Sequence, residues 1–232
     1  MKERLAKFIA DCGVASRRGA EDLIKSGAVS VNGEIVDTPV VFVDENDDVR
    51  VKGKKLQKQN EIRLYMFHKP INTMTTTCDP DGRRTIYDVL DKQYRNLKYI
   101  GRLDFKTSGL LLLTNNGDFA RTISLPANQI PRTYIATVNN WTERGLDIAR
   151  RGVTLDGVKY RPMDIKVLDE HNLSVTVVEG KKNEIRIVFK YIKSPIVALH
   201  RVKYGPISLG KLGVGKISEI DKKTIDEMLK NL

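Results

Sequence analysis

The sequence predicts an α+β protein made of two parts, a small N-terminal module and a larger domain. Apolar residues recur at helical spacing within residues 5–12, whereas four consecutive leucines at residues 110–113 indicate a buried strand. A polar stretch rich in Lys and Gln, residues 52–61, is typical of a linker. We therefore expect the module to occupy residues 1–58 and the larger domain residues 62–232.

The composition excludes several classes of protein. No stretch approaches the ~18 consecutive apolar residues that a membrane span needs, and 41% apolar with 30% charged residues is ordinary for a folded protein. Two cysteines, Cys12 and Cys78, are too few for a disulfide framework or a four-ligand zinc site. Because charges interrupt the apolar run of residues 1–13, this segment is not a secretory signal, and we expect a cytoplasmic protein.

The net charge predicts an acidic partner. The 232 residues carry 40 Lys and Arg against 29 Asp and Glu, a formal net charge of +11. Residues 1–60 hold 11 basic and 10 acidic residues, so nearly all of the surplus lies in the larger domain. It is densest over residues 181–203, where seven basic residues and one acid are interleaved with apolar ones. This segment is either a solvated surface or an element with one buried face and one basic face that follows nucleic acid.

The module begins with two predicted helices. Apolar residues at positions 5, 8, 9 and 12 share one face of the first helix, which Gly13 can end. Ser16 can cap the second helix, which ends near Gly27. Asn32-Gly33, set between alternating apolar residues, then predicts a tight hairpin. Two short helices therefore lead into a small sheet.

Two arginines stand at the start of the second predicted helix. Arg17 and Arg18 lie beside the backbone amides of its first turn, and such a combination makes a phosphate-sized site. The alternative is that both side chains are solvated. Taken together, residues 2–56 resemble an S4 domain, a small RNA-binding module. The resemblance implies that Arg17, Arg18 and Lys25 contact structured RNA.

One loop of the larger domain indicates chemistry. Residues 101–109, GRLDFKTSG, directly precede the leucine strand, and the edge of a rigid strand is a good place to present a side chain. Asp104 is flanked there by Arg102 and Lys106, two cations that favour the ionised carboxylate. A carboxylate in a basic groove weakens the attraction for nucleic acid, which suggests a chemical role. The alternative is that Asp104 caps a turn or pairs with Arg102.

The sequence around this loop resembles the catalytic motif of pseudouridine synthases of the RsuA/RluB family. The match runs through GRLD, Thr107, Gly109, the leucine run and the TNNG turn. Three further family segments occur in the expected order, at residues 69–70, 131–138 and 179–189. The resemblance implies a mixed, mainly antiparallel sheet. It also implies isomerisation of a specific uridine in ribosomal RNA to pseudouridine, without a cofactor or a metal.

The resemblance implies roles for individual residues. Asp104 is the expected nucleophile, Tyr134 stacks on the target uracil and can take its C5 proton, and Arg186 pairs with the Asp104 carboxylate. Three routes stay open for Asp104: attack on C1′ of the ribose, assistance to departure of the base through an oxocarbenium-like state, or addition to C6 of the uracil. Arg102 is the expected wedge or positioning group for a flipped base. The remaining expected contacts are Lys69, Thr107 and Ile185 with the substrate, and Lys181 and Lys182 with the RNA backbone.

The chain departs from the family pattern at three places near these segments. Asn72 replaces the usual Gly, and Ile187 replaces a second Arg after Arg186. Arg132 and Thr133 precede Tyr134 where Lys or Glu is common. Glu184 and residues 201–209 favour the type that modifies 23S rRNA of the large subunit. The alternatives are the same reaction on 16S rRNA, or an inactive RNA-binding factor of ribosome assembly. The expected partner is ribosomal RNA or a pre-ribosomal particle, and the protein is expected to be a monomer.

Two other patterns carry less weight. Residues 210–216 fit the phosphate-binding pattern GxxxxGK, but Ile217 stands where a hydroxyl would hold Mg²⁺. A glycine-rich bend before a C-terminal helix is the better interpretation. His68, His171 and His200 lie in unrelated sequence contexts, so we expect no histidine-based nucleophilic triad.

Overall fold

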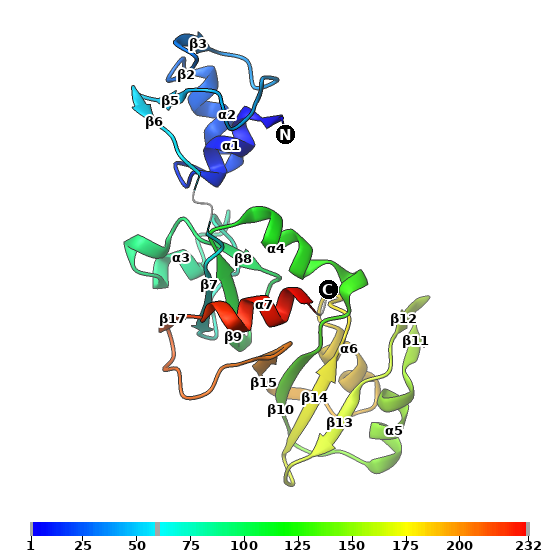
Figure 1. Ribbon diagram of the computed structural model, residues 1–232. Helices are drawn as coiled ribbons and strands as arrows, with labels where there is room; N and C mark the ends of the chain where they lie inside the picture. Colours follow the sequence, from blue (N-terminus) through cyan, green and yellow to red (C-terminus); the bar gives the residue numbers. More distant parts are fainter. Residues whose placement is uncertain (1, 59–60, 231–232) are drawn as a thin grey trace.

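The fold is α+β and has two parts (Figure 1). The computed structural model describes residues 2–58 and 61–230. The N-terminal module contains β1 Glu3–Arg4, α1 Leu5–Asp11, α2 Arg17–Lys25, β2 Val29–Val31, β3 Glu34–Val36, β4 Phe42–Val43, β5 Val49–Val51 and β6 Lys54–Lys55. Strands β3, β2, β5 and β6 form one antiparallel sheet, and β1 pairs with β4.

The local sequence explains the elements of the module. Ser16 accepts a hydrogen bond from the Gly19 amide at 3.0 Å, and so caps α2 as expected. Asn32 and Gly33 both adopt positive φ, at 52° and 90°, which is the conformation of the predicted hairpin turn. The apolar faces of α1 and α2 close over this sheet in a core of their own, which includes the fully buried Leu5 and Ile24.

The larger domain contains the remaining elements. They are β7 Leu64–Lys69, α3 Ile86–Val89, the 3₁₀ turn η1 Lys92–Tyr94, β8 Lys98–Ile100, β9 Thr107–Thr114, α4 Gly117–Ser124, the 3₁₀ turn η2 Pro126–Asn128, β10 Arg132–Val138, α5 Glu143–Arg151, β11 Val153–Leu155, β12 Val158–Tyr160, β13 Asp164–Val167, β14 Asn172–Val177, α6 Glu184–Tyr191, β15 Ile196–Tyr204, β16 Ile207–Ser208, β17 Ile217–Glu219 and α7 Lys222–Lys230.

A nine-stranded sheet forms the centre of this domain. Its main order is β13-β14-β10-β15-β9-β7-β17, with β8 beside β9 and β16 beside β15. Among the strands of the described chain, only β9 and β15 pair in parallel, over residues 107–109 and 199–201. The sheet is therefore mixed and mainly antiparallel, as predicted. The parallel pair is also the joint between its two halves.

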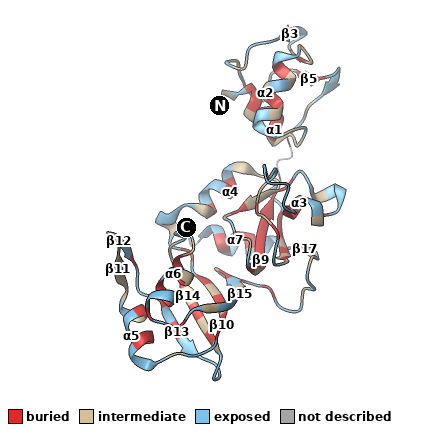
Figure 2. Ribbon diagram, turned by 180° about the vertical axis from the view of Figure 1, so that it is seen from behind, coloured by how far each residue is buried: buried red, intermediate tan, exposed pale blue. Residues whose placement is uncertain are grey.

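The leucine strand is buried on both faces, as its composition predicts (Figure 2). Leu111 and Leu113 face a core that is closed by α5 and α6. Leu110 and Leu112 face a second core, which is closed by α4 and α7. All four leucines have zero exposed surface, so β9 is the rigid centre of the domain.

Gly109 allows β9 and β15 to approach closely at their parallel joint. Its φ is +106°, and a Cβ added there would lie 2.2 Å from the carbonyl oxygen of Arg201 and 2.6 Å from its amide nitrogen. Real Cβ atoms do not come so close to backbone atoms, so only glycine fits this position.

Three boundaries differ from the sequence prediction. Residues 54–55 form β6 and pair with β5, so the first half of the predicted linker belongs to the module. Residues 107–109, predicted as loop, already belong to β9. The glycine-rich bend is followed by β17 before the C-terminal helix begins at Lys222, because residues 217–219 pair with β7. The boundary around residues 59–60 and the last two residues, 231–232, lie outside the described chain.

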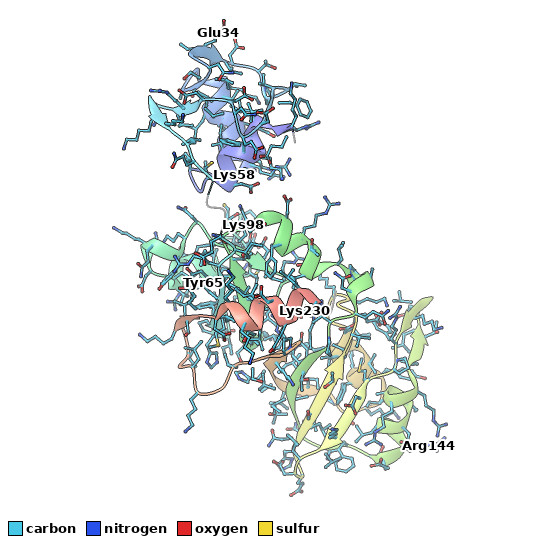
Figure 3. The ribbon with its side chains drawn as sticks, viewed as in Figure 1. Glu34, Lys58, Tyr65, Lys98, Arg144 and Lys230 are labelled. Atoms are coloured by element: carbon cyan, nitrogen blue, oxygen red, sulfur yellow. The ribbon has the colours of Figure 1, made fainter. Side chains whose placement is uncertain are left out.

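Two ion pairs join the module to the larger domain. Lys7 of α1 contacts Asp118 of α4 at 2.7 Å. Lys98 of β8 contacts Asp11 of α1 at 2.9 Å. Figure 3 shows Lys98 at the end of the larger domain that faces the module. Each part contributes one cation and one carboxylate to this contact.

We predict that Gly109→Ala strongly destabilises the protein, because the added methyl group overlaps the Arg201 backbone. Thermal unfolding should show a fall in Tm of about 10 °C or more, or no folded protein. Gly157→Ala is the matched control, since Gly157 also has positive φ, +76°, but nothing lies within 4 Å of its added Cβ. A similar Tm for the two variants would contradict the role of Gly109 in the joint.

Candidate active site

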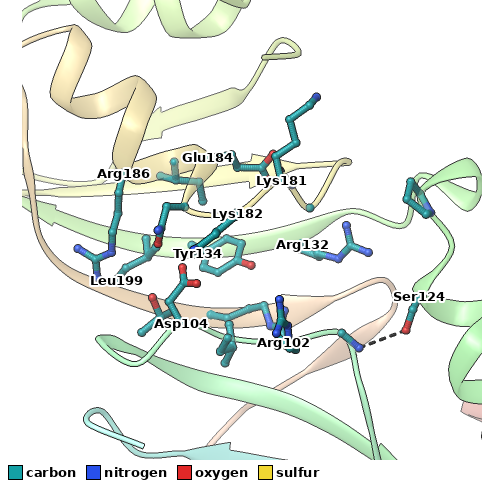
Figure 4. A pocket seen from close by; sticks show the side chains of 18 residues that line it. Arg102, Asp104, Ser124, Arg132, Tyr134, Lys181, Lys182, Glu184, Arg186 and Leu199 are labelled. Atoms are coloured by element: carbon teal, nitrogen blue, oxygen red, sulfur yellow. Dashed lines mark hydrogen bonds between the residues drawn. The ribbon is translucent and has the colours of Figure 1, made fainter. Parts of the chain in front are cut away.

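A cavity of about 300 Å³ opens on the face of the sheet at the parallel joint. Among the residues that line it are eight that the sequence predicted for the site, Arg102, Asp104, Thr107, Tyr134, Lys181, Lys182, Ile185 and Arg186. In Figure 4, Asp104 rises from its loop toward Tyr134, with Arg186 on one side and Arg102 and Arg132 on the other. The cavity thus collects residues from β9, β10, α6 and the loop before β9.

Strand register places four residues in one row across the sheet, and two of them, Arg201 and Tyr134, line this cavity. Lys69 of β7 pairs with Gly109, Gly109 pairs with Arg201 of β15, and Arg201 pairs with Tyr134 of β10. Residues that are directly opposite on neighbouring strands point to the same face of a sheet. The row therefore brings two cations, a glycine and a tyrosine together beneath the loop that carries Asp104.

The Asp104 loop is held on both sides by hydrogen bonds to its backbone carbonyls. The Asn72 amide donates to the Phe105 carbonyl at 2.8 Å. Thr75 Oγ1 donates to the Leu103 carbonyl at 2.9 Å. The Asp104 carboxylate itself is half-buried and makes no hydrogen bond or ion pair with any residue of the described chain. Its oxygens are therefore available to a substrate.

Asn72 has the backbone conformation for which a family member would use glycine. Its φ is +54°, in the left-handed region that asparagine tolerates better than most residues. The departure from the family pattern at this position therefore keeps the turn, and the amide of Asn72 still anchors the Asp104 loop.

Lys69 has a different position from the one expected for a substrate contact. It has zero exposed surface, and its ammonium donates to the carbonyls of Pro70, Asp104 and Thr107 at 3.0, 3.2 and 2.8 Å. Burial lowers the pKa of Lys69 to about 8, although the charge of Asp104 opposes this effect. All three N–H groups are occupied, so the expected contact with substrate is replaced by a role in fixing the Asp104 loop.

Arg186 does not pair with Asp104 in this structure, contrary to the expectation. Its Nη1 donates to the Ile196 carbonyl at 3.3 Å and its Nη2 to the Lys106 carbonyl at 3.0 Å. Its Nε is buried and has no hydrogen-bond partner. Burial lowers the pKa of the Arg186 guanidinium and the charge of Asp104 opposes this, so the two groups are electrostatic neighbours without a bond.

Two arginines that line the cavity were not predicted as site residues from the sequence. Arg201, with 1% exposed surface, lies with its guanidinium carbon 6.0 Å from the Tyr134 ring centre and 5.3 Å from that of Tyr204. Arg132 donates to the Glu179 carbonyl at 3.1 Å and to the Tyr204 hydroxyl at 3.2 Å. A basic residue in an alternating strand next to a predicted site residue is the only sequence signal for them.

Glu184 is a buried acid on the cavity wall. It begins α6, follows Asn183 with its positive φ of 56°, and accepts a hydrogen bond from the Lys181 amide at 3.3 Å. Burial, together with the negative charge of Glu179, raises the pKa of Glu184 from 4.5 to about 7. Helix α6 occupies residues 184–191 of the basic segment 181–203. Its buried face also includes Val188 and Phe189, so this part of the segment is an element with one buried face rather than a solvated surface.

The basic residues expected on the module lie away from this cavity. Arg17, Arg18 and Lys25 are all exposed. Arg17 lines a second cavity, of about 750 Å³, between the module and the larger domain. Neither Arg18 nor Lys25 lines it.

The sheet brings two histidines together that the sequence did not relate. The rings of His68 and His200 are 5.1 Å apart, and His200 Nδ1 lies 2.9 Å from Ser108 Oγ. These side chains belong to the face of the sheet opposite Thr107 and Gly109. Within residues 2–58 and 61–230, no cluster of three or more His, Cys, Asp or Glu is arranged to hold a metal ion.

Comparison with known proteins gives the class that this fold and site define. The model of the RNA pseudouridylate synthase family matches residues 63–191, and that of the S4 domain matches residues 3–49. The chain belongs to the RNA pseudouridine synthase family, with an S4 domain at its N-terminal end. It is therefore an enzyme of the isomerase class rather than a nucleotide hydrolase.

Relatives match along the whole chain. The chain is 35% identical over 225 residues to ribosomal large subunit pseudouridine synthase B of Bacillus subtilis (strain 168), covering 94% of this chain and 92% of that one. It is 35% identical over 230 residues, 97% of each chain, to an uncharacterised RNA pseudouridine synthase of Rickettsia prowazekii (strain Madrid E). A crystal structure of a pseudouridylate synthase superimposes with a TM-score of 0.70 at 29% identity, covering 97% of this chain and 99% of that one.

We predict that Glu184→Gln changes how stability depends on pH. The folded state binds the Glu184 proton more tightly than the unfolded state, so wild-type stability falls as the pH rises from about 4.5 to about 7. Glutamine lacks this titration. Urea unfolding gives the free energy of unfolding of the variant and of wild type. The value for the variant minus that for wild type should be about 1–3 kcal/mol larger at pH 8 than at pH 4.5. If this difference is the same at both pH values, folding does not raise the pKa of Glu184.

Proposed function

We propose that the protein isomerises a uridine of ribosomal RNA to pseudouridine, and that this RNA is 23S rRNA. Asp104 is the nucleophile of the reaction. The observation that carries this proposal is the unpaired Asp104 carboxylate, which faces Tyr134 in a cavity of about 300 Å³. That volume is at the lower end for small-molecule sites, which suits one nucleoside. The large-subunit assignment is supported by the relatives in Bacillus subtilis and Vibrio cholerae that carry the name ribosomal large subunit pseudouridine synthase B.

The chemistry needs no external reactant. The N1–C1′ bond of the uridine breaks, the base turns, and C5 bonds to the same C1′. The proton on C5 is lost and N1 gains one, so the product has the composition of the substrate. Asp104 can attack C1′ and hold the ribose while the base turns, as carboxylates do in sugar chemistry. Attack of C5 on C1′ then breaks the bond to Asp104 and releases its carboxylate. Tyr134 stacks on the uracil, and its hydroxyl oxygen receives the C5 proton late in the reaction as the hydroxyl gives its own proton to solvent, from which N1 is protonated.

The target uridine must leave the stack of bases to reach Asp104. Flipping a base costs a few kcal/mol, and a residue that fills the gap offsets part of this cost. Arg102 is exposed at the mouth of the cavity, two residues before Asp104. A planar guanidinium stacks on neighbouring bases, so we assign the wedge to Arg102.

The second cavity extends the RNA surface from the active site to the S4 domain. Helix α4 joins the two cavities, because Gly117 and Arg121 line the second cavity and Ser124 lines the first. At eight residues, α4 spans about 12 Å. Asp11 and Asp118 in the second cavity are neutralised by Lys98 and Lys7.

Three arginines give the second cavity its net positive charge. They are Arg17, Arg95 and Arg121. We propose that the RNA backbone next to the flipped uridine follows α4 into this cavity. The protein acts there as a monomer on ribosomal RNA or a pre-ribosomal particle.

No helix within the described ranges is long and apolar enough to span a membrane. We propose that the enzyme meets its RNA in the cytoplasm.

We predict that Asp104→Asn lowers the rate of pseudouridine formation by about 10⁴-fold or more and leaves RNA affinity nearly unchanged, since the amide is a poor nucleophile of the same shape. Mapping of pseudouridines in 23S and 16S rRNA, from cells that lack the gene product and carry either form, measures the effect and finds the target. Asp91→Asn is the control, because Asp91 is exposed and lies outside the cavity. Equal pseudouridine with Asp104→Asn and wild type would refute the assignment.

We predict that Arg17→Glu combined with Arg121→Glu weakens RNA binding and lowers its salt dependence. Each lost phosphate contact should reduce the slope of log K against log salt by about 0.7 for single-stranded RNA. Arg17→Glu with Arg18→Glu should have a smaller effect, because Arg18 does not line the cavity. Arg144→Glu is the control, since Arg144 lies on α5 at the far end of the molecule (Figure 3). If all these variants bind alike, the RNA does not enter the second cavity.

A further inference from the structure

Two buried cations lie under the Asp104 loop, and the charge of Asp104 acts on one of them, Lys69, without forming an ion pair. Lys69 and Arg201 have 0% and 1% exposed surface, and they flank Gly109 in the row across the sheet. Neither forms an ion pair with any acid of the described chain. The charge of Arg201 also lowers the pKa of Lys69, which shows that the two groups act on each other.

The hydrogen bonds of the two cations are unequal. All three N–H groups of Lys69 are taken up by backbone carbonyls. Arg201 donates its Nε–H to the Leu110 carbonyl at 2.6 Å, but its Nη2 is buried and has no hydrogen-bond partner among the described residues. A buried donor without a partner is costly, and in native proteins it is often part of a functional site.

Packing alone does not explain why this residue is an arginine. Its guanidinium lies against Tyr134 and Tyr204, but Tyr204 already has a second guanidinium, that of Arg132, 5.0 Å from its ring centre. An apolar side chain of similar volume would pack against two rings without the cost of burying a charge. A buried positive charge in the floor of an active site is best explained by a negative charge that forms there.

We propose that Arg201, supported by Lys69, stabilises the negative charge that develops on the uracil when the glycosidic bond breaks. This inference rests on the proposed function. The electron pair of the N1–C1′ bond stays with the base, which leaves as an anion with its charge on N1 and the two carbonyl oxygens. Asp104 takes the bond to C1′. No proton has to be added to the base for this step, and Arg201 lines the cavity, so its fixed positive charge acts on the anion from the cavity wall.

The exposed cations around the cavity are less suited to this task. Arg102, Lys181 and Lys182 are exposed, so water and salt screen their charges. Arg201 lines the same cavity but is buried, where a fixed charge acts through a lower effective dielectric. Preorganised charges of this kind have large effects on rate because they need no reorganisation during the reaction.

The test compares leaving groups. RNA that contains uridine or 5-fluorouridine at the target is given to wild-type enzyme, Arg201→Gln and Arg201→Lys under single-turnover conditions. Unreacted nucleoside is then counted after nuclease digestion. Fluorine stabilises the uracil anion, so 5-fluorouridine depends less on the enzyme for that stabilisation. We expect Arg201→Gln to lower the single-turnover rate about 10²- to 10³-fold with uridine. With 5-fluorouridine the factor by which the rate falls should be at least ten times smaller. Arg201→Lys keeps the charge and should recover part of the rate, and RNA affinity should stay the same.

A structural role predicts a different pattern. Tyr204→Phe is the control, because it removes the hydroxyl that accepts from Arg132 and donates to the Ile123 carbonyl but leaves every charge in place. It should slow both substrates by the same factor. The proposal would be overturned if Arg201→Gln slowed the reactions of uridine and 5-fluorouridine by the same factor. If that variant does not fold, the same result with Arg201→Lys would overturn it. Absence of reaction with wild type would refute the proposed function instead, so the two failures are distinguishable.

Discussion

The close approach of β9 and β15 at Gly109 is the constraint on which the site depends. The two halves of the sheet meet there in a short parallel pairing, and only a residue without Cβ permits the contact. The Asp104 loop enters β9 just before this point, and Arg201 of β15 lies directly opposite Gly109. Tyr134 is the next residue along the row. One glycine therefore fixes the distance between the predicted nucleophile, the buried cation and the aromatic ring.

Electrostatics at the site follow from depth within the fold. Exposed cations surround the mouth of the cavity, where they can meet phosphates in water. Deeper, Lys69 and Arg201 are buried, and the carboxylate of Asp104 has intermediate exposure. With the roles proposed for them, RNA attraction and chemistry use different cations. The same net charge of +11 serves both, because the sheet separates the groups by burial.

Local sequence patterns predicted the elements but not their register. Helical spacing, the Ser16 cap, the Asn32-Gly33 turn and the leucine run depend on neighbours along the chain, and the structure contains each of them. Asp104 was found through its motif, and it does line the cavity. The row from Lys69 to Tyr134 depends on strands that are distant in sequence, so no local pattern revealed it. The same reason accounts for the unexpected neighbours His68 and His200.

The directions in which the Lys69 and Arg186 side chains point could also not be predicted from the sequence. A lysine before a proline gives no sign that its ammonium turns inward to three carbonyls, and an arginine near a carboxylate gives no sign that it prefers two carbonyls of its own. Both arrangements follow from the need to pair backbone groups in a buried loop.

The ion pairs between the S4 domain and the larger domain have a consequence for how the enzyme responds to its surroundings. Lys7 with Asp118 and Lys98 with Asp11 are partly exposed, so dissolved ions compete with them just as they compete for RNA phosphates. Rising ionic strength therefore has two effects. It weakens the binding of RNA phosphates, and it weakens the ion pairs that hold the S4 domain against the larger domain. The orientation of the S4 domain is thus a property of the ionic surroundings as well as of the enzyme.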